Sequence, residues 1–319
     1  MKDMWKRGIL GVVIGDALGC PVQFESRSEV AYHPVTDMRG YGTFNLPEGS
    51  WTDDSSLTLA LLDSINRVNG VDLVDIMENF VDWLENGKFT PYGYSYDIGR
   101  GTMNAIRAYE YGSNTEECGG KDSWNNGNGS LMRIMPVCLY CIENNFGFRE
   151  VELIHSVGSL THAHIRANIA CGLYYFMAKA IVNDEGTLVE RMQKGLDKGF
   201  AYYENMLTDI TELDYYKRLR DLNRFAKTSI NDIRSSGYVV DSLEASVWSL
   251  ITTNDFTSAL LRAVNLGDDT DTVGAITGGL AGLFYGINEE HGIPSKWIDK
   301  VQRIDWIKGM CEKADNKAK

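Results

Sequence analysis

Apolar residues recur along nearly the whole chain at the three- and four-residue spacing of amphipathic helices, and the alternation typical of strands is scarce. The stretch 4–18 is mostly apolar, which predicts a buried helix. A second helix is expected to open at residues 52–54, with Leu57 and Leu61 on its apolar face. Further helices are predicted over residues 72–86, 97–111, 131–144, 149–159, 163–183, 187–205, 211–228, 240–253, 256–266, 270–287 and 294–313. No shift in composition marks a boundary, so the pattern predicts a single compact all-α domain over residues 1–319.

The composition is that of an ordinary folded protein, since 44% of the 319 residues are hydrophobic and 24% are charged. Acidic residues outnumber basic ones by 44 to 31. The resulting net charge of −13 repels phosphate backbones. No apolar run approaches the roughly 18 residues of a transmembrane helix, and the run 9–14 is too short for a signal peptide. We therefore expect neither nucleic acid nor a membrane as a partner.

The six cysteines are scattered, mostly through apolar stretches. This usage indicates a reducing compartment without a disulfide framework, so a cytoplasmic location is expected. Cys138 and Cys141 have CxxC spacing, but no second pair accompanies them. We interpret both as thiols in a helix core rather than as a metal or redox pair.

Two short acidic segments, more than 200 residues apart, carry the candidate chemistry. One is SWTDDSS from Ser50, and the other is LGDDTDTVGA from Leu266. Each places aspartates beside threonine hydroxyls at the expected start of an apolar helix. Capping explains such residues, because Asp and Thr cap helices well and suit the positive end of the helix dipole. One cap needs only one such residue, however, and these clusters offer more oxygen ligands than capping requires.

The helix after the second acidic segment is rich in glycine and alanine between residues 274 and 282, so another helix can approach it closely. If the two acidic helix starts meet, four or more carboxylates share one site, which requires cations. Oxygen-only ligands suit Mg²⁺ or Mn²⁺. Two such ions would bring about +4 against about −5 from Asp53, Asp54, Asp269, Asp271 and Glu25. The residues alone leave open a binuclear metal site at the helix N-termini and simple capping.

Five segments resemble the ADP-ribosylglycohydrolases, a family that includes the dinitrogenase reductase-activating glycohydrolase and hydrolases of ADP-ribosylarginine and ADP-ribosylserine. The matching segments are GVVIGDALGCPVQFE from Gly11, WTDDSSLTLALLDS from Trp51, GNGSLMRIMP from Gly127, LTHAH from Leu160 and GDDTDTVGAITGGLAGLFYG from Gly267. They follow the family's order over residues 8–290, nearly the whole chain. The last segment, with its glycine-rich helix, is the most specific.

The resemblance implies two Mg²⁺ or Mn²⁺ ions held by residues of both acidic segments, namely Thr52, Asp53, Asp54, Asp269, Asp271 and Thr272. Asp268 stands one place before the family's ligand position, and we interpret it as an acid outside the ligand set. Glu25 matches a family glutamate near the metals that has a catalytic role in some members. The alternative for Glu25 is a solvated loop acid.

The glycine-rich loop before a helix expected from Leu131 is a candidate anion site, because its backbone N–H groups can approach a phosphate and the helix dipole favours one. A turn followed by a cap explains the same residues equally well. The resemblance implies that the ADP-ribose diphosphate and the adjoining ribose bind around this loop, at Asn126, Gly127, Asn128, Gly129 and Ser130. Gly99 and Gly101 form a second candidate phosphate cradle.

Two further side chains are singled out by the resemblance. His162 follows Thr161 as in the family, where the imidazole lies beside the ligand, although a lone histidine is more often structural. Asp97 belongs to a YDIG stretch similar to that of the arginine-specific bacterial members, in which an acid here lies in the active site. A carboxylate suits a guanidinium leaving group, and capping of the helix 97–111 is the alternative.

The resemblance thus implies a metal-dependent hydrolase that removes ADP-ribose from modified protein side chains, with arginine favoured, by cleaving the glycosidic bond at the ribose anomeric carbon. In this hypothesis the ions orient the ribose hydroxyls and a water, and Glu25 or Asp97 assists proton transfer. A hydrolase of ADP-ribosylserine or other O-linked ADP-ribose, a two-metal nucleotide phosphohydrolase and a non-catalytic crystallin-like scaffold remain alternatives. The expected partner is an ADP-ribosylated protein or ADP-ribose conjugate. The sequence predicts no oligomeric state.

Overall fold

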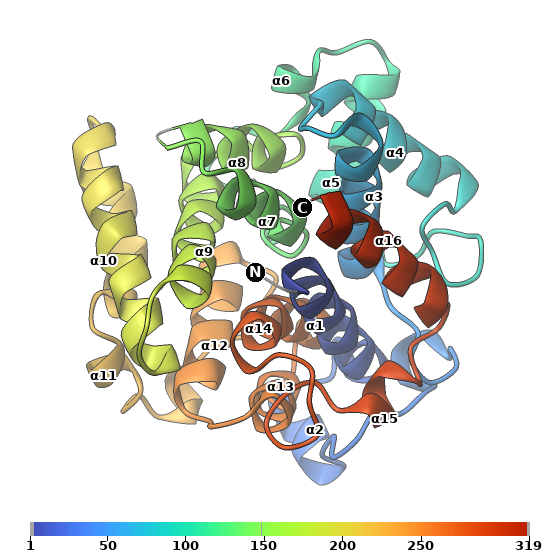
Figure 1. Ribbon diagram of the computed structural model, residues 1–319, viewed down its shortest axis with the longest axis vertical. Coiled ribbons are helices and arrows are strands. Elements are labelled where there is room, and N and C mark those ends of the chain that lie inside the picture. The colour runs from blue at the N-terminus through green and yellow to red at the C-terminus, as the bar shows by residue number, and fades with distance from the viewer. Residues whose placement is uncertain (1–2, 148, 318–319) are drawn as a thin grey trace.

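Helices make up the regular structure of residues 3–147 and 149–317, the part of the chain that the computed structural model describes (Figure 1). The α-helices are α1 (Met4–Gly19), α2 (Arg27–Tyr32), α3 (Asp53–Val68), α4 (Leu73–Asn86), α5 (Arg100–Glu110), α6 (Thr115–Cys118), α7 (Met135–Asn144), α8 (Arg149–Ser159), α9 (Ile165–Asn183), α10 (Leu188–Met206), α11 (Leu222–Phe225), α12 (Val239–Ile251), α13 (Phe256–Val264), α14 (Thr270–Tyr285), α15 (Ser295–Ile298) and α16 (Ile304–Lys317). Four 3₁₀ helices accompany them, η1 (Cys20–Val22), η2 (Gly42–Phe44), η3 (Ile210–Arg220) and η4 (Ile230–Asp232). Within these residues β-pairing is limited to three isolated bridges, which confirms the all-α prediction.

Helices α1 and α14 lie side by side at the centre of the molecule (Figure 1). Their backbones touch through glycines, because a Cβ on Gly11 would lie 2.1 Å from the carbonyl oxygen of Gly278. A Cβ on Gly15 would lie 2.0 Å from the carbonyl oxygen of Gly274, so only glycine permits this approach. The expected close approach to the small-residue helix is therefore confirmed. The two helices run antiparallel, and the end of α1 meets the start of α14, where the Thr270 hydroxyl donates to a carbonyl of α1 at 2.8 Å.

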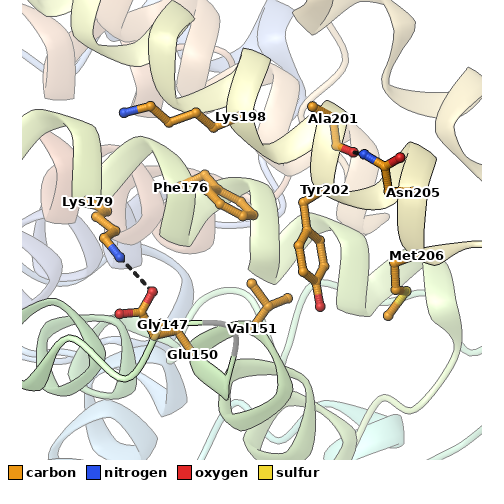
Figure 2. Close-up of a pocket in the computed structure, with 10 residues that line it drawn as sticks. All are labelled: Gly147, Glu150, Val151, Phe176, Lys179, Lys198, Ala201, Tyr202, Asn205 and Met206. Carbon is orange, nitrogen blue, oxygen red and sulfur yellow. Dashed lines mark hydrogen bonds and ion pairs between the residues drawn. The ribbon is translucent and has the colours of Figure 1, made fainter.

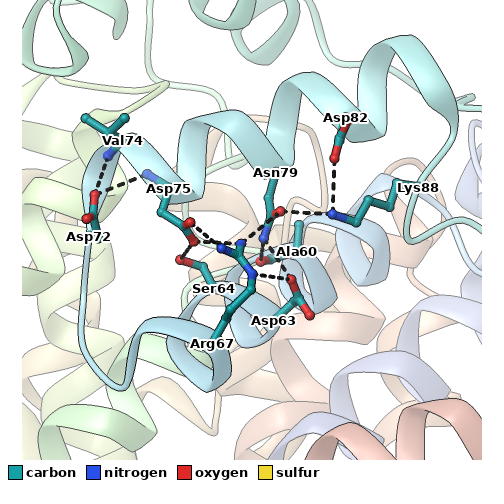
Figure 3. A network of polar contacts seen from close by, with 10 residues as sticks. All are labelled: Ala60, Asp63, Ser64, Arg67, Asp72, Val74, Asp75, Asn79, Asp82 and Lys88. Atoms are coloured by element: carbon teal, nitrogen blue, oxygen red, sulfur yellow. Dashed lines mark hydrogen bonds and ion pairs between the residues drawn. The ribbon is translucent and has the colours of Figure 1, made fainter.

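A network of polar contacts holds α3 against α4 (Figure 3). The Arg67 guanidinium donates to both carboxylate oxygens of Asp75, at 2.5 and 2.8 Å, and the Ser64 hydroxyl donates to the same carboxylate at 2.6 Å. Deeper between the helices, the buried amide of Asn79 donates to the carbonyl of Ala60 at 2.8 Å. These contacts fix the direction of α3, whose first turn carries the first acidic segment.

A cavity of about 590 Å³ lies among α8, α9 and α10. Figure 2 shows Phe176, Val151 and Tyr202 around its centre, so its walls are largely apolar. At one edge the buried carboxylate of Glu150 pairs with the ammonium of Lys179 at 2.6 Å. None of the residues that line this cavity belongs to the candidate site predicted from the sequence.

The helix predicted over residues 211–228 is wrong. The structure has the 3₁₀ helix η3 there, followed by the short α11, and Asp221 separates the two with an extended backbone. The Asp221 side chain accepts a hydrogen bond from the N–H of Arg224 at 3.0 Å and so caps α11. An aspartate that bonds the backbone locally competes with helix continuation, which is why one helix does not run through this segment.

The helix predicted over residues 294–313 is also wrong, because α15 and α16 are separate. Arg303, just before α16, has a φ of +53°, in the left-handed region that breaks a right-handed helix. The backbone N–H of Gln302 donates to the carbonyl of Gly49 at 3.0 Å, and the Arg303 guanidinium donates to the carbonyl of Thr90 at 2.7 Å. Contacts to two distant loops therefore set this break.

The helix expected from Leu131 begins four residues later, at Met135. Pro136 occupies its first turn, where the missing N–H of proline leaves no helical bond unmade. A helix that began at Leu131 would need that N–H, so residues 131–133 form a turn instead. The glycine-rich loop consequently does not sit at the N-terminus of α7, and the helix-dipole argument for anion binding there is wrong.

All six cysteines are buried and free, and Cys138 and Cys141 lie in the core-facing α7. Both observations agree with the interpretation of these residues as core thiols. Among the described residues, no helix combines the length and the apolar character that crossing a membrane requires.

Candidate active site

The two acidic segments, far apart in sequence, meet at the N-termini of α3 and α14. The Thr52 hydroxyl lies 3.2 Å from Oδ2 of Asp54 and 3.2 Å from Oδ2 of Asp271. The Thr272 hydroxyl lies 3.4 Å from the same Asp54 oxygen. All four side chains are buried. The close contact of α1 and α14 positions the second acidic segment. A carboxylate of α1 that caps α3 positions the first.

Asp16 on α1 is the residue that fastens α3 to this site, and it is not among the residues singled out from the sequence. Its carboxylate is fully buried and accepts hydrogen bonds from the backbone N–H groups of Thr52 at 3.0 Å and Ser55 at 2.9 Å. It also accepts from the Thr52 hydroxyl at 3.0 Å. The first turn of α3 is thus capped by another helix, and Thr52 makes no side-chain cap of its own.

Capping does not explain the acidic segments. The side chain of neither N-cap residue, Thr52 of α3 nor Asp269 of α14, accepts a capping hydrogen bond from a backbone N–H in the first turn of its helix. The capping alternative requires such a bond. The concentration of carboxylates therefore calls for another partner.

The electrostatics of the cluster oppose its full ionisation. Burial raises the pKa of Asp54 well above its usual value, and the neighbouring carboxylates of Asp16, Asp269 and Asp97 raise it further. Burial and nearby carboxylates act in the same direction on the pKa values of Asp53 and Asp271. Burial raises the pKa of Asp16 to about 7, although its hydrogen bonds from Ser55 and Thr52 counteract the shift. Only positive charge can stabilise several ionised carboxylates in this volume.

The donor set fits hard divalent cations. Two carboxylate oxygens of the predicted ligand set, Oδ1 of Asp54 and Oδ1 of Asp271, are buried without a hydrogen-bond partner in the described structure. Unpartnered buried carboxylate oxygens are the atoms that Mg²⁺ or Mn²⁺ would coordinate. Within residues 3–147 and 149–317, no three acidic, histidine or cysteine side chains converge in a metal-binding arrangement, so the structure defines no ion position.

A cavity of about 240 Å³ opens beside the cluster. Ten of the residues singled out from the sequence line it, namely Asp53, Asp97, Gly99, Gly101, Gly127, Asn128, Gly129, His162, Asp269 and Thr272. Thr52, Asp54 and Asp271 are buried next to it without lining it. The structure thus brings most of the predicted residues to one place.

Three further predicted residues, Glu25, Asn126 and Ser130, also lie off the cavity lining. Glu25 is half-buried, and its carbonyl accepts a hydrogen bond of 2.7 Å from the N–H of the exposed Asp268. The buried Asn126 donates to the carbonyl of Ser123 at 2.8 Å. Ser130 is fully buried, with its hydroxyl oxygen 3.6 Å from the thiol of Cys171. Asn126 and Ser130 therefore flank the glycine-rich loop and contact protein groups rather than the cavity.

His162 faces the cavity between glycines. A Cβ on Gly101 would lie 2.8 Å from its Nε2, and a Cβ on Gly129 would lie 2.8 Å from its Cε1. Its Nδ1 lies 2.8 Å from the hydroxyl of Thr161, which fixes the ring. Burial lowers the pKa of His162 to about 3, so the imidazole is neutral near pH 7. A neutral, fixed ring in a glycine-walled cavity is suited to hydrogen bonding with a ligand.

Asn128 joins the glycine-rich loop to the acidic cluster. Its amide nitrogen donates to Oδ2 of Asp269 at 2.6 Å and to the Ser242 hydroxyl at 2.9 Å. Its backbone N–H donates to the carbonyl of Gly237, another residue of the cavity wall, at 3.0 Å. Asn128 therefore orients an acidic residue as well as lining the cavity.

Asp97 lies three residues before α5 and does not cap it, because Gly99 holds the N-cap position. The capping alternative for Asp97 is therefore wrong. Its φ of +54° is a left-handed conformation, which no residue of a right-handed helix adopts. Burial raises the pKa of Asp97, and interactions with Asp271 and Gln23 act in the opposite direction.

Sequence reasoning missed several residues of the cavity wall, among them Gln23, Arg100 and Thr102. Gln23 stands within the first family-like segment, and Arg100 stands between the two glycines of the second candidate cradle. Arg100 is exposed and brings a positive charge to the mouth of an otherwise acidic cavity. The sequence signal for Gln23 and Arg100 was their position inside segments that had already been singled out.

The comparison with known proteins agrees with this site. A family model described as ADP-ribosylglycohydrolase matches residues 2–319. The chain belongs to the ADP-ribosylglycohydrolase family. It is 30% identical to the ADP-ribosylarginine hydrolase Tri1 of Serratia proteamaculans, over 97% of this chain and 78% of the relative. It is 29% identical to the ADP-ribosyl-[dinitrogen reductase] glycohydrolase of Rhodospirillum rubrum, over 92% of this chain and 88% of the relative.

A solved structure described as an ADP-ribosylglycohydrolase-related protein complex is similar over its full extent. The TM-score is 0.76 at 25% sequence identity, covering 99% of this chain and 98% of the other. As an ADP-ribosylglycohydrolase, the chain is a hydrolase. Its cavity sets carboxylates on one side and a neutral imidazole, glycine backbone and an arginine on the other, an arrangement suited to a ligand with both hydroxyl and phosphate groups.

Proposed function

We propose that the chain hydrolyses the bond between ADP-ribose and a protein arginine side chain, with the aid of two Mg²⁺ or Mn²⁺ ions. The observation that carries the proposal is the position of Asp97, whose carboxylate lines the same cavity as Asp53 and Asp269 and keeps one buried oxygen without a partner. A guanidinium group is the cation that a fixed carboxylate binds best, through paired charge-assisted hydrogen bonds. Relatives named ADP-ribosylarginine hydrolases, each about 30% identical, support the same substrate.

The ions would be held by Thr52, Asp53, Asp54, Asp269, Asp271 and Thr272. When bound, they would supply Lewis-acid polarisation of the ribose hydroxyls and of the attacking water. Their charge would offset the raised pKa values of the surrounding aspartates and keep these residues ionised.

The other residues bind the substrate and move a proton. His162 and the backbone of Gly99, Gly101, Gly127 and Gly129 bind the diphosphate and adjoining ribose. The cavity of about 240 Å³ is smaller than most small-molecule sites, which supports enclosure of the diphosphate and the adjoining ribose rather than of the whole ADP-ribose. Asp97 holds the guanidinium as the bond from the anomeric carbon to nitrogen breaks. Water gives its hydroxyl to that carbon and its proton to the departing nitrogen, and Asp97 assists this transfer.

Asp97 is favoured over Glu25 as the proton-transfer residue, because Glu25 does not line the cavity. The expected products are free ADP-ribose and an unmodified arginine. We further propose a cytoplasmic location, which the six free cysteines support.

The test is a release assay with an ADP-ribosylarginine protein and, separately, an ADP-ribosylserine peptide, each with Mg²⁺, Mn²⁺ or EDTA. We expect cation-dependent release of intact ADP-ribose from arginine. Release from the serine peptide alone would instead assign hydrolysis of the ADP-ribosylserine bond. Phosphate or AMP as product would assign a phosphohydrolase, and bound metal without any product would assign a scaffold.

A further inference from the structure

A further cavity, of about 660 Å³, lies on the surface formed by η3, α11 and the residues that follow them up to Asp232. Four basic side chains line it, Lys217, Arg218, Arg220 and Arg224. It shares no lining residue with the active-site cavity. Figure 1 shows α11 beside α10, at the edge of the molecule. This basic cavity, as we call it, is therefore a separate surface feature.

The charge of this region is opposite to that of the protein. Residues 217–234 carry six basic and two acidic side chains, within a chain whose net charge is −13. A positive region on a negative protein attracts anionic groups and restricts where they bind.

Two of the four basic side chains in the basic cavity form no ion pair within residues 3–147 and 149–317. Arg218 pairs with Glu244 at 2.6 Å, and Arg220 pairs with Glu204 at 2.8 Å. Lys217 and Arg224 are exposed and form no ion pair with any residue of the described ranges. These two cations are available to a partner.

The basic cavity adjoins the active site along the chain. Asp232 lines the basic cavity, and Gly237, five residues later, lines the active-site cavity. Five residues span at most about 18 Å. Arg27 fixes the connecting segment, because its guanidinium donates to the carbonyls of Ile233 at 2.5 Å and Leu266 at 2.8 Å. A chain whose modified side chain enters the active site can therefore reach the basic cavity.

We propose that the basic cavity docks an acidic segment of the ADP-ribosylated protein substrate, a proposal that rests on the function proposed above. Lys217 and Arg224 pair with aspartate or glutamate side chains near the modified arginine. A peptide meets only this positive region, whereas an extended nucleic acid would also meet the negative remainder of the surface. The docking surface thus selects proteins whose modified arginine has acidic neighbours.

The test compares the wild-type enzyme with the double variant Lys217→Glu/Arg224→Glu. The substrates are free ADP-ribosylarginine and two ADP-ribosylarginine peptides that differ only in flanking glutamates or glutamines. We expect the variant to lower kcat/KM for the glutamate peptide about five-fold at low salt, because reversing two exposed charges removes two weak attractions and adds repulsion. At about 0.5 M salt the difference should vanish. Rates on free ADP-ribosylarginine should stay unchanged.

The matched control is Arg149→Glu/Lys313→Glu, which changes the net charge equally at two exposed positions outside both cavities. An equal loss of kcat/KM in this control, or equal losses on both peptides, would overturn the docking surface.

Fluorescence anisotropy with an unmodified glutamate-rich peptide gives a readout that does not depend on hydrolysis. Peptide binding that the double variant loses, without any hydrolysis by wild type, would reject the proposed function and keep the surface. Tighter binding of a single-stranded RNA would reject the acidic-peptide assignment.

Discussion

Gly278 and Gly11 touch through their backbones, since a Cβ atom on Gly278 would lie 2.0 Å from the carbonyl oxygen of Gly11. An added methyl group has no room there unless α1 and α14 separate. That contact also positions one half of the acidic cluster. Overpacking at this position therefore affects both the stability of the fold and the site.

We predict that Gly278→Ala lowers the free energy of unfolding by about 3 kcal/mol, as overpacked cores do. The control is Gly309→Ala in α16, where an added Cβ would meet no heavy atom within 4 Å. That substitution should raise stability by about 0.5–1 kcal/mol, because alanine restricts the unfolded chain and favours the helix. Urea unfolding of both variants measures the sign of each change in the free energy of unfolding. Equal effects would show that the glycine contact does not limit the approach of the helices.

Replacement of Asp97 separates the two candidate proton-transfer residues. Asp97→Asn keeps the shape of the side chain and removes its proton-transfer capacity, so kcat on ADP-ribosylarginine should fall about 10²- to 10⁴-fold. Glu25→Gln should lower kcat less than about ten-fold, because Glu25 does not line the cavity. Both variants should keep a cation-dependent rise in melting temperature. A larger loss for Glu25→Gln than for Asp97→Asn would reverse the assignment.

Metal removal should destabilise the protein. A cation present at about 100 times its Kd adds about 2.7 kcal/mol by linkage, so Mg²⁺ or Mn²⁺ should raise the melting temperature relative to EDTA. Asp271→Asn should lose this rise and should equal or exceed wild type in EDTA, because it removes one of several buried carboxylates that repel each other. Asp305→Asn, at an exposed position of α16, is the control that keeps the rise. Differential scanning fluorimetry with and without cation measures the melting temperatures of the wild type and both variants. An unchanged wild-type melting temperature would count against the metal site.

Glu244 makes the stability of the fold depend on pH. It is 6% exposed, and burial raises its pKa from 4.5 to about 7, although Arg218 counteracts the shift. A folded-state pKa above the unfolded value means that the folded state binds the proton more tightly. The stabilisation is therefore complete below pH 4.5 and is lost as the pH rises through 7.

We predict that Glu244→Gln loses less stability than wild type between pH 5 and pH 8, by up to about 3 kcal/mol. The measurement is urea unfolding at both pH values with saturating Mg²⁺, so that the acidic cluster contributes equally to both proteins. Parallel pH profiles for the variant and wild type would contradict the raised pKa of Glu244.

The sequence was sufficient for the main helices and for the two acidic segments, because both depend on local patterns. The apolar spacing of α3 and α4 follows the helical period, and the glycines of α14 indicate a close neighbour. The pattern could not identify that neighbour as α1. The contact depends on glycines in two segments that lie far apart in the chain, and neither set by itself indicates which helix it packs against.

Asp16 could not be assigned from the sequence, because its partners are distant. Thr52 and Ser55 lie 36 and 39 residues further along the chain. Apart from its place in an apolar helix and in the first family-like segment, nothing local distinguishes this carboxylate from an exposed one. The break at Arg303 depends similarly on contacts with Gly49 and Thr90. By contrast, Pro136 and Asp221 are local signals for the start of α7 and of α11, and both starts are predictable when caps and proline are weighted above apolar spacing.

The pairing of α1 with α14 also bears on the order in which the protein is made. The hydroxyl of Thr270 and the carbonyl of Gly19 that it bonds are 251 residues apart. At about 5–20 residues per second, the ribosome delivers α14 roughly 13–50 seconds after α1. During that interval the glycine face of the first helix has no partner, and Asp53 and Asp54 have no opposing acids. The acidic cluster is thus completed late in synthesis, by the arrival of a single helix.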